Sequence, residues 1–135
     1  MRCIIDTNVL ISAALFPGST PAKAYFKAVM APHVAIVCDY SIDELRRVFN
    51  NKFEDKLHIL DSFLAFLLRS VEVVDTPPEE DASDSELLIR DINDRPILRS
   101  ALHSNADLLI TGDKDFLESG LTSPQIVTSA EFLNI

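Results

Sequence analysis

Short, fully apolar runs alternate with longer amphipathic stretches from one end of the chain to the other. We expect strands at the apolar runs, which occupy residues 2–6, 34–38, 71–74, 107–111 and 125–128. The amphipathic stretches follow the helical period and predict helices at about 8–15, 21–31, 42–51, 54–69, 95–104, 114–118 and 129–133. Strands that are apolar on both faces and separated by helices indicate a parallel sheet covered on both sides. The predicted fold class is α/β, a three-layer α/β/α sandwich with a small central parallel sheet of four to five strands.

Two helices carry recognisable start signals. Thr20 followed by Pro21 suits a cap and a first helical position, and the run from Ser41 to Glu44 has the spacing of a capping box. In contrast, the stretch from Asp75 to Glu86 is acidic, polar and rich in proline, which is typical of a mobile surface loop.

The composition is that of a single domain. With 135 residues, of which 47% are apolar, the chain can bury a sizeable core, and we expect one domain over residues 1–135. Cys3 and Cys38 lie in strand-like runs without zinc-binding spacing, which favours reduced thiols and a cytoplasmic location. The most apolar helical stretch, 57–68, is interrupted by Asp61, so we expect no membrane-spanning segment.

The charge is unevenly distributed. A net charge of −9 argues at first against a nucleic-acid partner, because phosphate binding usually requires a basic surface. However, nine of the 21 acidic residues lie between Glu72 and Asp94, where Arg90 is the one base. The remaining chain holds 12 acids and 11 bases, so its charge leaves a nucleic-acid partner open.

Carboxylates follow two of the predicted strands directly. Asp6 ends the first strand, and Asp113 follows the fourth, close to Asp115. In open parallel sheets, functional groups collect beyond the carboxyl ends of the strands. Each carboxylate also has a simpler interpretation: Asp6 and Asp94 suit helix caps, Glu44 suits the capping box, Asp113 and Asp115 suit a turn after Gly112, and Asp91 competes with Asp94.

Convergence of Asp6, Glu44, Asp94 and Asp113 at one sheet edge would change their chemistry. Like charges raise each other's pKa unless a cation compensates, and an all-oxygen set of ligands favours Mg²⁺ or Mn²⁺, as one or two ions. Such ions activate water and stabilise charge on phosphate during phosphodiester hydrolysis. Flanking phosphates could then contact the nearby basic side chains, which are Arg46, Arg47, Lys52, Lys56, Arg95, Arg99 and Lys114.

Four segments together resemble the PIN-domain family, namely "CIIDTNVLISA", "SIDELRRVFNNKF", "RDINDRPILRSALHSNADLLITGDKDF" and "IVTSAEFL". The likeness covers nearly the whole chain and is closest to the stand-alone prokaryotic branch, the toxin components of toxin-antitoxin pairs. It implies a metal-dependent ribonuclease with a three-layer α/β/α fold. Asp6, Glu44, Asp94 and Asp113 would be its catalytic, metal-binding acids, with Asp115 as a variable fifth ligand.

The resemblance also implies supporting residues and partners. Asn8 and Thr111 match positions that orient the acids or the attacking water, and we assign substrate binding to Arg46, Arg95 and Lys114. The expected partners are the RNA substrate, a small antitoxin that docks on the helical arm, and a second copy in a homodimer or higher oligomer. The chain departs from the family pattern in its acidic loop and in Arg95–Pro96.

Two other functions stay open at this point. A catalytically silent module of the same fold would use its acids as caps and act through the apolar helix 54–69. That helix carries Leu57, Leu60, Leu64, Leu67 and Leu68 on one face, widened by Ile59, Phe63 and Phe66, and core packing is favoured over a groove or dimer seam. A phosphatase of the haloacid dehalogenase type is less favoured, because it needs a second acid where Asn8 stands.

Overall fold

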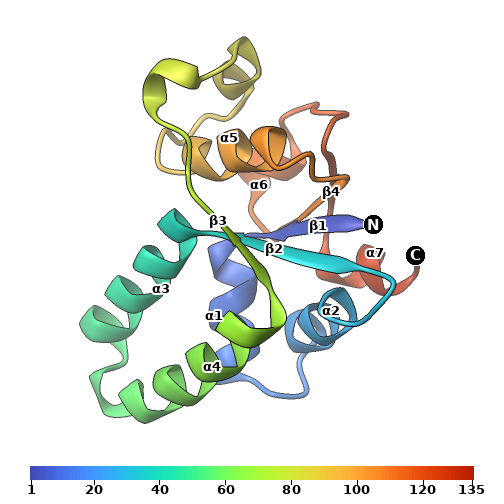
Figure 1. The fold of residues 1–135 in the computed structure, drawn as a ribbon. Helices are drawn as coiled ribbons and strands as arrows, with labels where there is room; N and C mark the ends of the chain where they lie inside the picture. Colours follow the sequence, from blue (N-terminus) through green and yellow to red (C-terminus); the bar gives the residue numbers. More distant parts are fainter.

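Five parallel strands form one sheet between two layers of helices in the computed structural model, which describes residues 1–135 (Figure 1). The sheet order is β3-β2-β1-β4-β5. The strands are β1 (Arg2–Ile5), β2 (Val34–Cys38), β3 (Glu72–Val74), β4 (Leu108–Ile110) and β5 (Gln125–Val127). The predicted α/β sandwich with its small parallel sheet is confirmed.

The helices divide unequally between the two faces of the sheet (Figure 1). One face is covered by α1 (Thr7–Leu15), α2 (Thr20–Ala28), α3 (Asp39–Lys52), α4 (Leu57–Ser70) and α7 (Ser129–Leu133). The other face is covered by α5 (Arg95–His103) and α6 (Lys114–Leu117). Short 3₁₀ turns complete the chain at η1 (Glu54–Lys56), η2 (Glu79–Asp81) and η3 (Asp84–Leu88).

The hydrophobic core has two parts, one on each face of the sheet. Cys3 and Ile5 of β1 belong to the larger cluster, under α1 to α4 and α7, whereas Ile4 between them belongs to the smaller cluster. In the smaller cluster Ile4 packs with Ile97 of α5 and Phe116 of α6. The alternation of side chains along a strand therefore explains why these apolar runs are buried on both faces.

Two predicted helix starts are wrong in detail. Helix α2 is capped by Ser19, whose hydroxyl accepts a hydrogen bond from the N–H of Ala22, so Thr20 is its first residue rather than its cap. Helix α3 begins at Asp39, which places Ser41 inside the helix and rules out the predicted capping box with Glu44. The earlier start is fixed by Asp39, whose carboxylate accepts hydrogen bonds from Thr76 near the end of β3.

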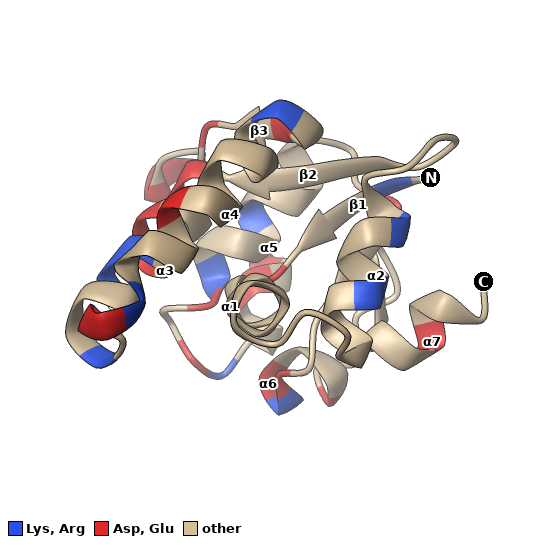
Figure 2. Ribbon diagram, turned by 90° about the horizontal axis from the view of Figure 1, so that it is seen from below, with Lys and Arg blue, Asp and Glu red and all other residues tan.

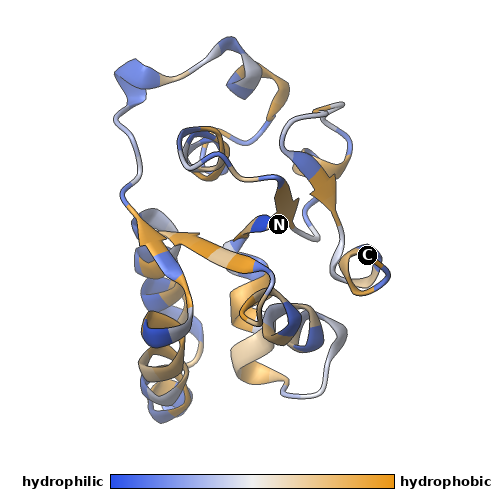
Figure 3. Cartoon of the chain, turned by 45° about the vertical axis from the view of Figure 1, so that its right-hand side comes forward, coloured by the Kyte–Doolittle hydropathy of each residue, from blue (hydrophilic) through white to orange (hydrophobic).

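The acidic stretch that precedes α5 is exposed for most of its length and mainly hydrophilic in Figure 3. It is nevertheless fixed to the domain by Glu86, which is 4% exposed and forms a bidentate ion pair with Arg99 of α5. Arg99 also donates a hydrogen bond to the carbonyl of Pro77, so one buried guanidinium anchors both ends of the stretch.

The apolar side chains of helix α4 lie partly in the core and partly at the surface. Leu60, Leu64 and Leu67 are buried in the larger core cluster, as core packing predicts. Phe66 is 40% exposed and packs against the exposed Phe26 of α2, with ring centroids 6.0 Å apart. The helix thus contributes both to the core and to an apolar surface. None of the helices has the length and apolarity that a membrane crossing requires.

Candidate functional site

The order in which the chain adds strands to the sheet changes direction between β1 and β4, which are hydrogen-bonded neighbours. From β1 the chain proceeds to β2 and β3 on one side, while β4 leads to β5 on the other. Ligands of open α/β sheets bind at this kind of switch point, beyond the carboxyl ends of the strands. Asp6 follows β1 here, and its backbone N–H donates to the carbonyl of Ile110 at the end of β4 (3.0 Å).

Asp6 is buried but does not cap a helix. It occupies the cap position of α1 without making a side-chain cap hydrogen bond, and it is 2% exposed. The hydroxyl of Thr111 donates to its Oδ2 (2.7 Å), which fixes the orientation of the carboxylate. Burial raises the pKa of Asp6 to about 6, although the Thr111 hydrogen bond opposes the rise, and repulsion from Asp113 and Glu44 adds to it.

Asp94 is the second carboxylate at a helix start that makes no cap hydrogen bond. Its Oδ2 is buried and has no hydrogen-bond partner in the protein. Burial raises the pKa of Asp94, and the neighbouring carboxylate of Asp113 raises it further, together with the charges of Asp6 and Asp91. An unpaired buried carboxylate oxygen is costly, which is why such an atom suggests a missing ligand.

Asp113 and Asp115 have partners of their own at the start of α6. One oxygen of Asp113 accepts from the N–H of Asp115 (2.9 Å), so this residue does act as a cap, and its own N–H donates to the hydroxyl of Thr111 (3.0 Å). The carboxylate of Asp115 pairs with Arg90 (2.8 Å), whose side chain is 87% exposed. Asp113 therefore caps α6, where the sequence suggested only a turn, whereas the cap interpretation of Asp6 and Asp94 is wrong.

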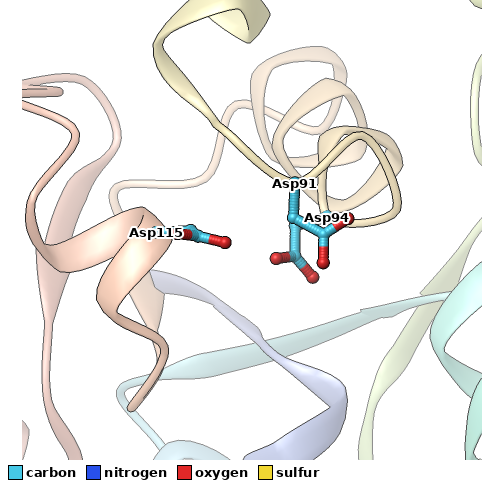
Figure 4. Close-up of side chains that lie close together, drawn as sticks. All are labelled: Asp91, Asp94 and Asp115. Atoms are coloured by element: carbon cyan, nitrogen blue, oxygen red, sulfur yellow. The ribbon is translucent and has the colours of Figure 1, made fainter.

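Figure 4 shows Asp115 pointing from α6 toward Asp91 and Asp94, which project from the segment before α5. Carboxylate oxygens of these three residues lie within 4.8 Å of one another. Asp91 was considered in the sequence only as a rival to Asp94. The spacing of three residues could have revealed it, because the N–H of Asp94 donates to the carbonyl of Asp91 in a single turn (3.1 Å), which brings both side chains to one place.

Glu44 lies in the second turn of α3, half-buried, at the edge of a hollow of about 330 Å³. Because α3 begins at Asp39, Glu44 has no capping role, and its charge instead contributes to the raised pKa of Asp6. Arg47 and Lys52, one and two turns farther along α3, line the same hollow. The structure thus places Glu44 beside the other acids, with cations on its far side.

The remaining predicted residues lie in different surroundings. Asn8 is exposed, whereas Thr111 is fully buried and contacts two of the acids. Arg46 is exposed and does not line the hollow at Glu44. Arg95 donates through Nε to the carbonyl of Ile89, and Lys114 lines a smaller hollow beside Asp115, of about 200 Å³.

Thr7, the residue after Asp6, has an unusual environment that the sequence did not indicate. It follows Asp6 directly and is 1% exposed, and its hydroxyl oxygen has no hydrogen-bond partner. A threonine at the first position of a helix gives no sequence signal of such an environment. Thr7 and Asp94 thus each carry a buried oxygen without a hydrogen-bond partner.

The acids are partly compensated by backbone dipoles. Asp6, Asp94 and Asp113 occupy the cap positions of α1, α5 and α6, so the positive ends of three helices point at the site. These partial charges do not satisfy the free oxygen of Asp94. A set of donors made entirely of oxygen, with an unpaired buried member, fits a hard divalent cation such as Mg²⁺ or Mn²⁺.

Comparison with known proteins is consistent with this geometry. A family model described as PIN domain matches residues 2–115. Among solved structures, VapBC2 from Rickettsia felis, bound to a DNA fragment from their promoter, superposes with a TM-score of 0.68 at 15% identity, covering 95% of this chain and 98% of that chain. PAE2754 from Pyrobaculum aerophilum gives 0.69 at 18% identity, covering 99% and 88%. No curated protein matches the sequence. The two structures share the fold of this chain.

Proposed function

The chain belongs to the PIN domain family, and we propose that it is a metal-dependent endoribonuclease that hydrolyses RNA phosphodiester bonds. The observation that carries the proposal is the buried, unpaired Oδ2 of Asp94 in the middle of an acidic cluster. A structural carboxylate at a helix start would use that oxygen to cap the helix, and Asp94 does not. A ligand oxygen, in contrast, has to be left free by the protein.

The proposed ligands of one or two Mg²⁺ or Mn²⁺ ions are Asp6, Glu44, Asp94 and Asp113, with Asp115 as an additional ligand. When bound, such an ion activates water as a nucleophile and neutralises charge on the phosphate. Thr111 holds Asp6 and the backbone of Asp113 in fixed positions through its hydroxyl, which preorganises the ligands before the ion binds.

The decisive experiment incubates the purified protein with a mixed panel of RNAs, with and without Mg²⁺ or Mn²⁺. The wild-type protein should cleave only with the metal, and Asp6→Asn and Asp113→Asn should each lose about a thousandfold in rate, because several kcal/mol of barrier lowering depend on the same ions. Asp61→Asn, an exposed acid on α4, is the matched control and should cleave normally. Cleavage that persists in both site variants would assign the activity to another protein or another site.

We further propose that the chain is the toxin of a toxin-antitoxin pair in the cytoplasm, where a small antitoxin binds it. The fold that it shares with VapBC2 supports this proposal, as do its two buried free cysteines. Expression of the wild-type chain should arrest bacterial growth, and Asp94→Asn should not. Normal growth with both proteins at equal abundance would contradict a toxin role.

The exposed apolar surface of α2 and α4 supports a homodimer. Phe26 and Phe66 are 50% and 40% exposed and lie against each other. Exposed apolar surface of this kind is commonly an interaction site. Light scattering after size-exclusion chromatography should give twice the 15.0 kDa of one chain, and Phe66→Glu should shift it toward one.

A catalytically silent binding module is the second candidate, favoured by the partners that Asp113 and Asp115 already have. In that case the acids would cap α6 and pair with Arg90, and the module would act through the apolar surface of α4. Calorimetric titration with Mn²⁺ separates the two functions. Saturable heat that is lost in Asp6→Asn supports the enzyme, whereas no heat in any variant supports the module.

A further inference from the structure

A hollow of about 480 Å³, which we call the α5 hollow, lies between residues 79–87, residues 92–93 and the start of α5. Its apolar lining includes Leu87 and Ile92, which are 72% and 67% exposed and are the two most exposed large apolar side chains of the chain. Leu88, next to Leu87, is also 52% exposed. Apolar surface that gathers in this way is commonly an interaction site.

The walls of the α5 hollow are held in place by contacts within the chain. Glu86 and Arg99, which both line it, form the buried bidentate ion pair. Arg95 donates through Nε to the carbonyl of Ile89 (3.0 Å), which fixes the segment between Leu87 and Ile92 against α5. A site that is already fixed loses less conformational entropy when a partner binds. The two exposed apolar side chains are thus presented by an anchored segment.

The rim of the α5 hollow is acidic. It carries four exposed acids that form no ion pair, namely Glu79, Glu80, Asp81 and Asp84. Of the bases that line the hollow, Arg99 is neutralised by Glu86, which leaves Arg95 alone against the four acids. Figure 2 shows basic segments on α2, but this helix lies on the opposite face of the sheet from α5. The excess of negative charge at the rim attracts cationic partners.

We propose that the α5 hollow binds a segment of a separate protein in which a bulky apolar side chain is flanked by lysine or arginine. The apolar side chain would pack against Leu87 and Ile92, and its basic neighbours would pair with the free acids of the rim. Burial of apolar surface would supply most of the affinity, while complementary charge would select the partner. The proposal does not depend on the ribonuclease function.

The α5 hollow is separate from the apolar surface of α2 and α4, because these helices and α5 cover opposite faces of the sheet. The proposed partner therefore does not compete with the proposed homodimer. A second copy of the chain would have to offer the basic side of α2, where Lys23, Phe26 and Lys27 line one hollow. Phe26 belongs to the surface that we assign to the homodimer, so we do not assign the α5 hollow to a second copy. RNA is disfavoured as well, because the four free carboxylates would repel its phosphates.

The partner chemistry is tested by selecting random peptides of about 12 residues, displayed on phage, on the full chain. The selected sequences should combine a side chain of the size of leucine or phenylalanine with neighbouring lysine or arginine. One selected sequence is then made as a fluorescein-labelled peptide, and its dissociation constant is measured by fluorescence anisotropy at low and at high salt.

Two variants separate the apolar contribution from the charged one. Leu87→Ser/Ile92→Ser should weaken binding of the peptide at least about tenfold at both salt concentrations, because it removes the apolar contacts. Glu79→Gln/Glu80→Gln/Asp81→Asn should weaken binding about tenfold at low salt and much less at high salt, because salt screens exposed charges.

Matched controls change the same kinds of side chain elsewhere. Leu68→Ser removes an exposed leucine from α4, and Glu54→Gln/Asp55→Asn/Asp61→Asn removes three exposed acids near the start of α4. Both controls should bind the peptide as the wild type does. All variants change exposed side chains, and circular dichroism should show the melting curve of the wild type for each.

Several results would overturn the proposal. They are a selection that yields no peptide, peptides without basic residues, and a peptide that binds Leu87→Ser/Ile92→Ser as tightly as the wild type. Sedimentation velocity tests the second copy, because a lower mass for Leu87→Ser/Ile92→Ser than for the wild type would assign the α5 hollow to it. Weaker binding of RNA by the same variant would assign the hollow to nucleic acid instead.

Discussion

Replacing Asp6 with asparagine should stabilise the metal-free protein while abolishing cleavage. Asp6 is 2% exposed, and its pKa rises from 3.8 to about 6 because burial disfavours the charged form. At neutral pH this difference corresponds to about 3 kcal/mol against the ionised folded state. The new amide group has to find its own hydrogen-bond partner, which offsets part of the gain. We expect a net increase of about 1.5 kcal/mol in the free energy of unfolding, or about 5 °C in Tm.

The pH dependence of this gain has a definite sign. The folded-state pKa of Asp6 lies above its unfolded value, so the folded protein loses stability as the pH rises from about 4 to about 6, and the full loss is present above about pH 6. As the pH falls from 6 toward 4, the wild-type carboxylate takes up a proton and the destabilisation disappears. The advantage of Asp6→Asn should therefore be present at pH 8 and turn into a small disadvantage at pH 4, because the cost of placing the amide remains when the wild-type carboxylate is protonated.

Urea denaturation in EDTA at pH 8 and at pH 4 measures both effects, with Asp61→Asn as a control that should match the wild type at both values. Adding Mg²⁺ at a hundred times its dissociation constant should stabilise the wild type by about 2.7 kcal/mol and Asp6→Asn by much less. The order of stability should thus reverse when metal is present. If Asp6→Asn is instead less stable than the wild type in EDTA, equally at both pH values, then Asp6 is a structural residue and the reasoning is wrong.

Three further changes test the supports of the site and of the fold. Thr111→Val removes the hydroxyl that donates to Asp6 and should lower the initial rate of cleavage about tenfold to about a hundredfold, whereas Thr111→Ser should keep most of it. Glu86→Gln leaves Arg99 buried without a carboxylate and should reduce the free energy of unfolding in urea by about 3 kcal/mol; a change near zero would mean that the pair is hydrated. Ser19→Ala removes the cap of α2 and should lower the free energy of unfolding by about 1 kcal/mol. The rate of RNA cleavage should not change at a temperature where the variant is fully folded. A lower cleavage rate under that condition would contradict the prediction.

The fold could be predicted because its signals are local and repeated. Each strand is an apolar run of limited length, each helix has an amphipathic period, and together they admit few topologies. The start of α3 could not be predicted, because it depends on a contact between Asp39 and Thr76, which are 37 residues apart. The anchor of the acidic stretch was missed for a similar reason, since Glu86 and Arg99 look like ordinary surface charges in the sequence.

The candidate site was predictable to the extent that strand ends determine it. Asp6 and Asp113 follow neighbouring strands, so topology alone brings them together. Asp91 was considered only as a rival to Asp94, although its spacing of three residues allows a single turn that brings both side chains to one place. The basic residue beside Glu44 was hardest to predict, since Arg46 and Arg47 are adjacent in the sequence and only the rotation of α3 decides which one lines the hollow beside Glu44.

The helix starts show most clearly how much stability the fold loses at this site. Asp6 and Asp94 stand at the starts of α1 and α5, where a carboxylate normally accepts a backbone hydrogen bond worth about 1 kcal/mol, and neither does so. Asp113 shows that the chain can form such a cap at the same edge of the sheet. Two helices therefore forgo an available stabilisation, and two carboxylates, one buried and one half-buried, keep raised pKa values. Both losses have the same remedy, a cation that binds the oxygens left free, which is why we regard the cluster as a ligand set rather than a by-product of helix capping.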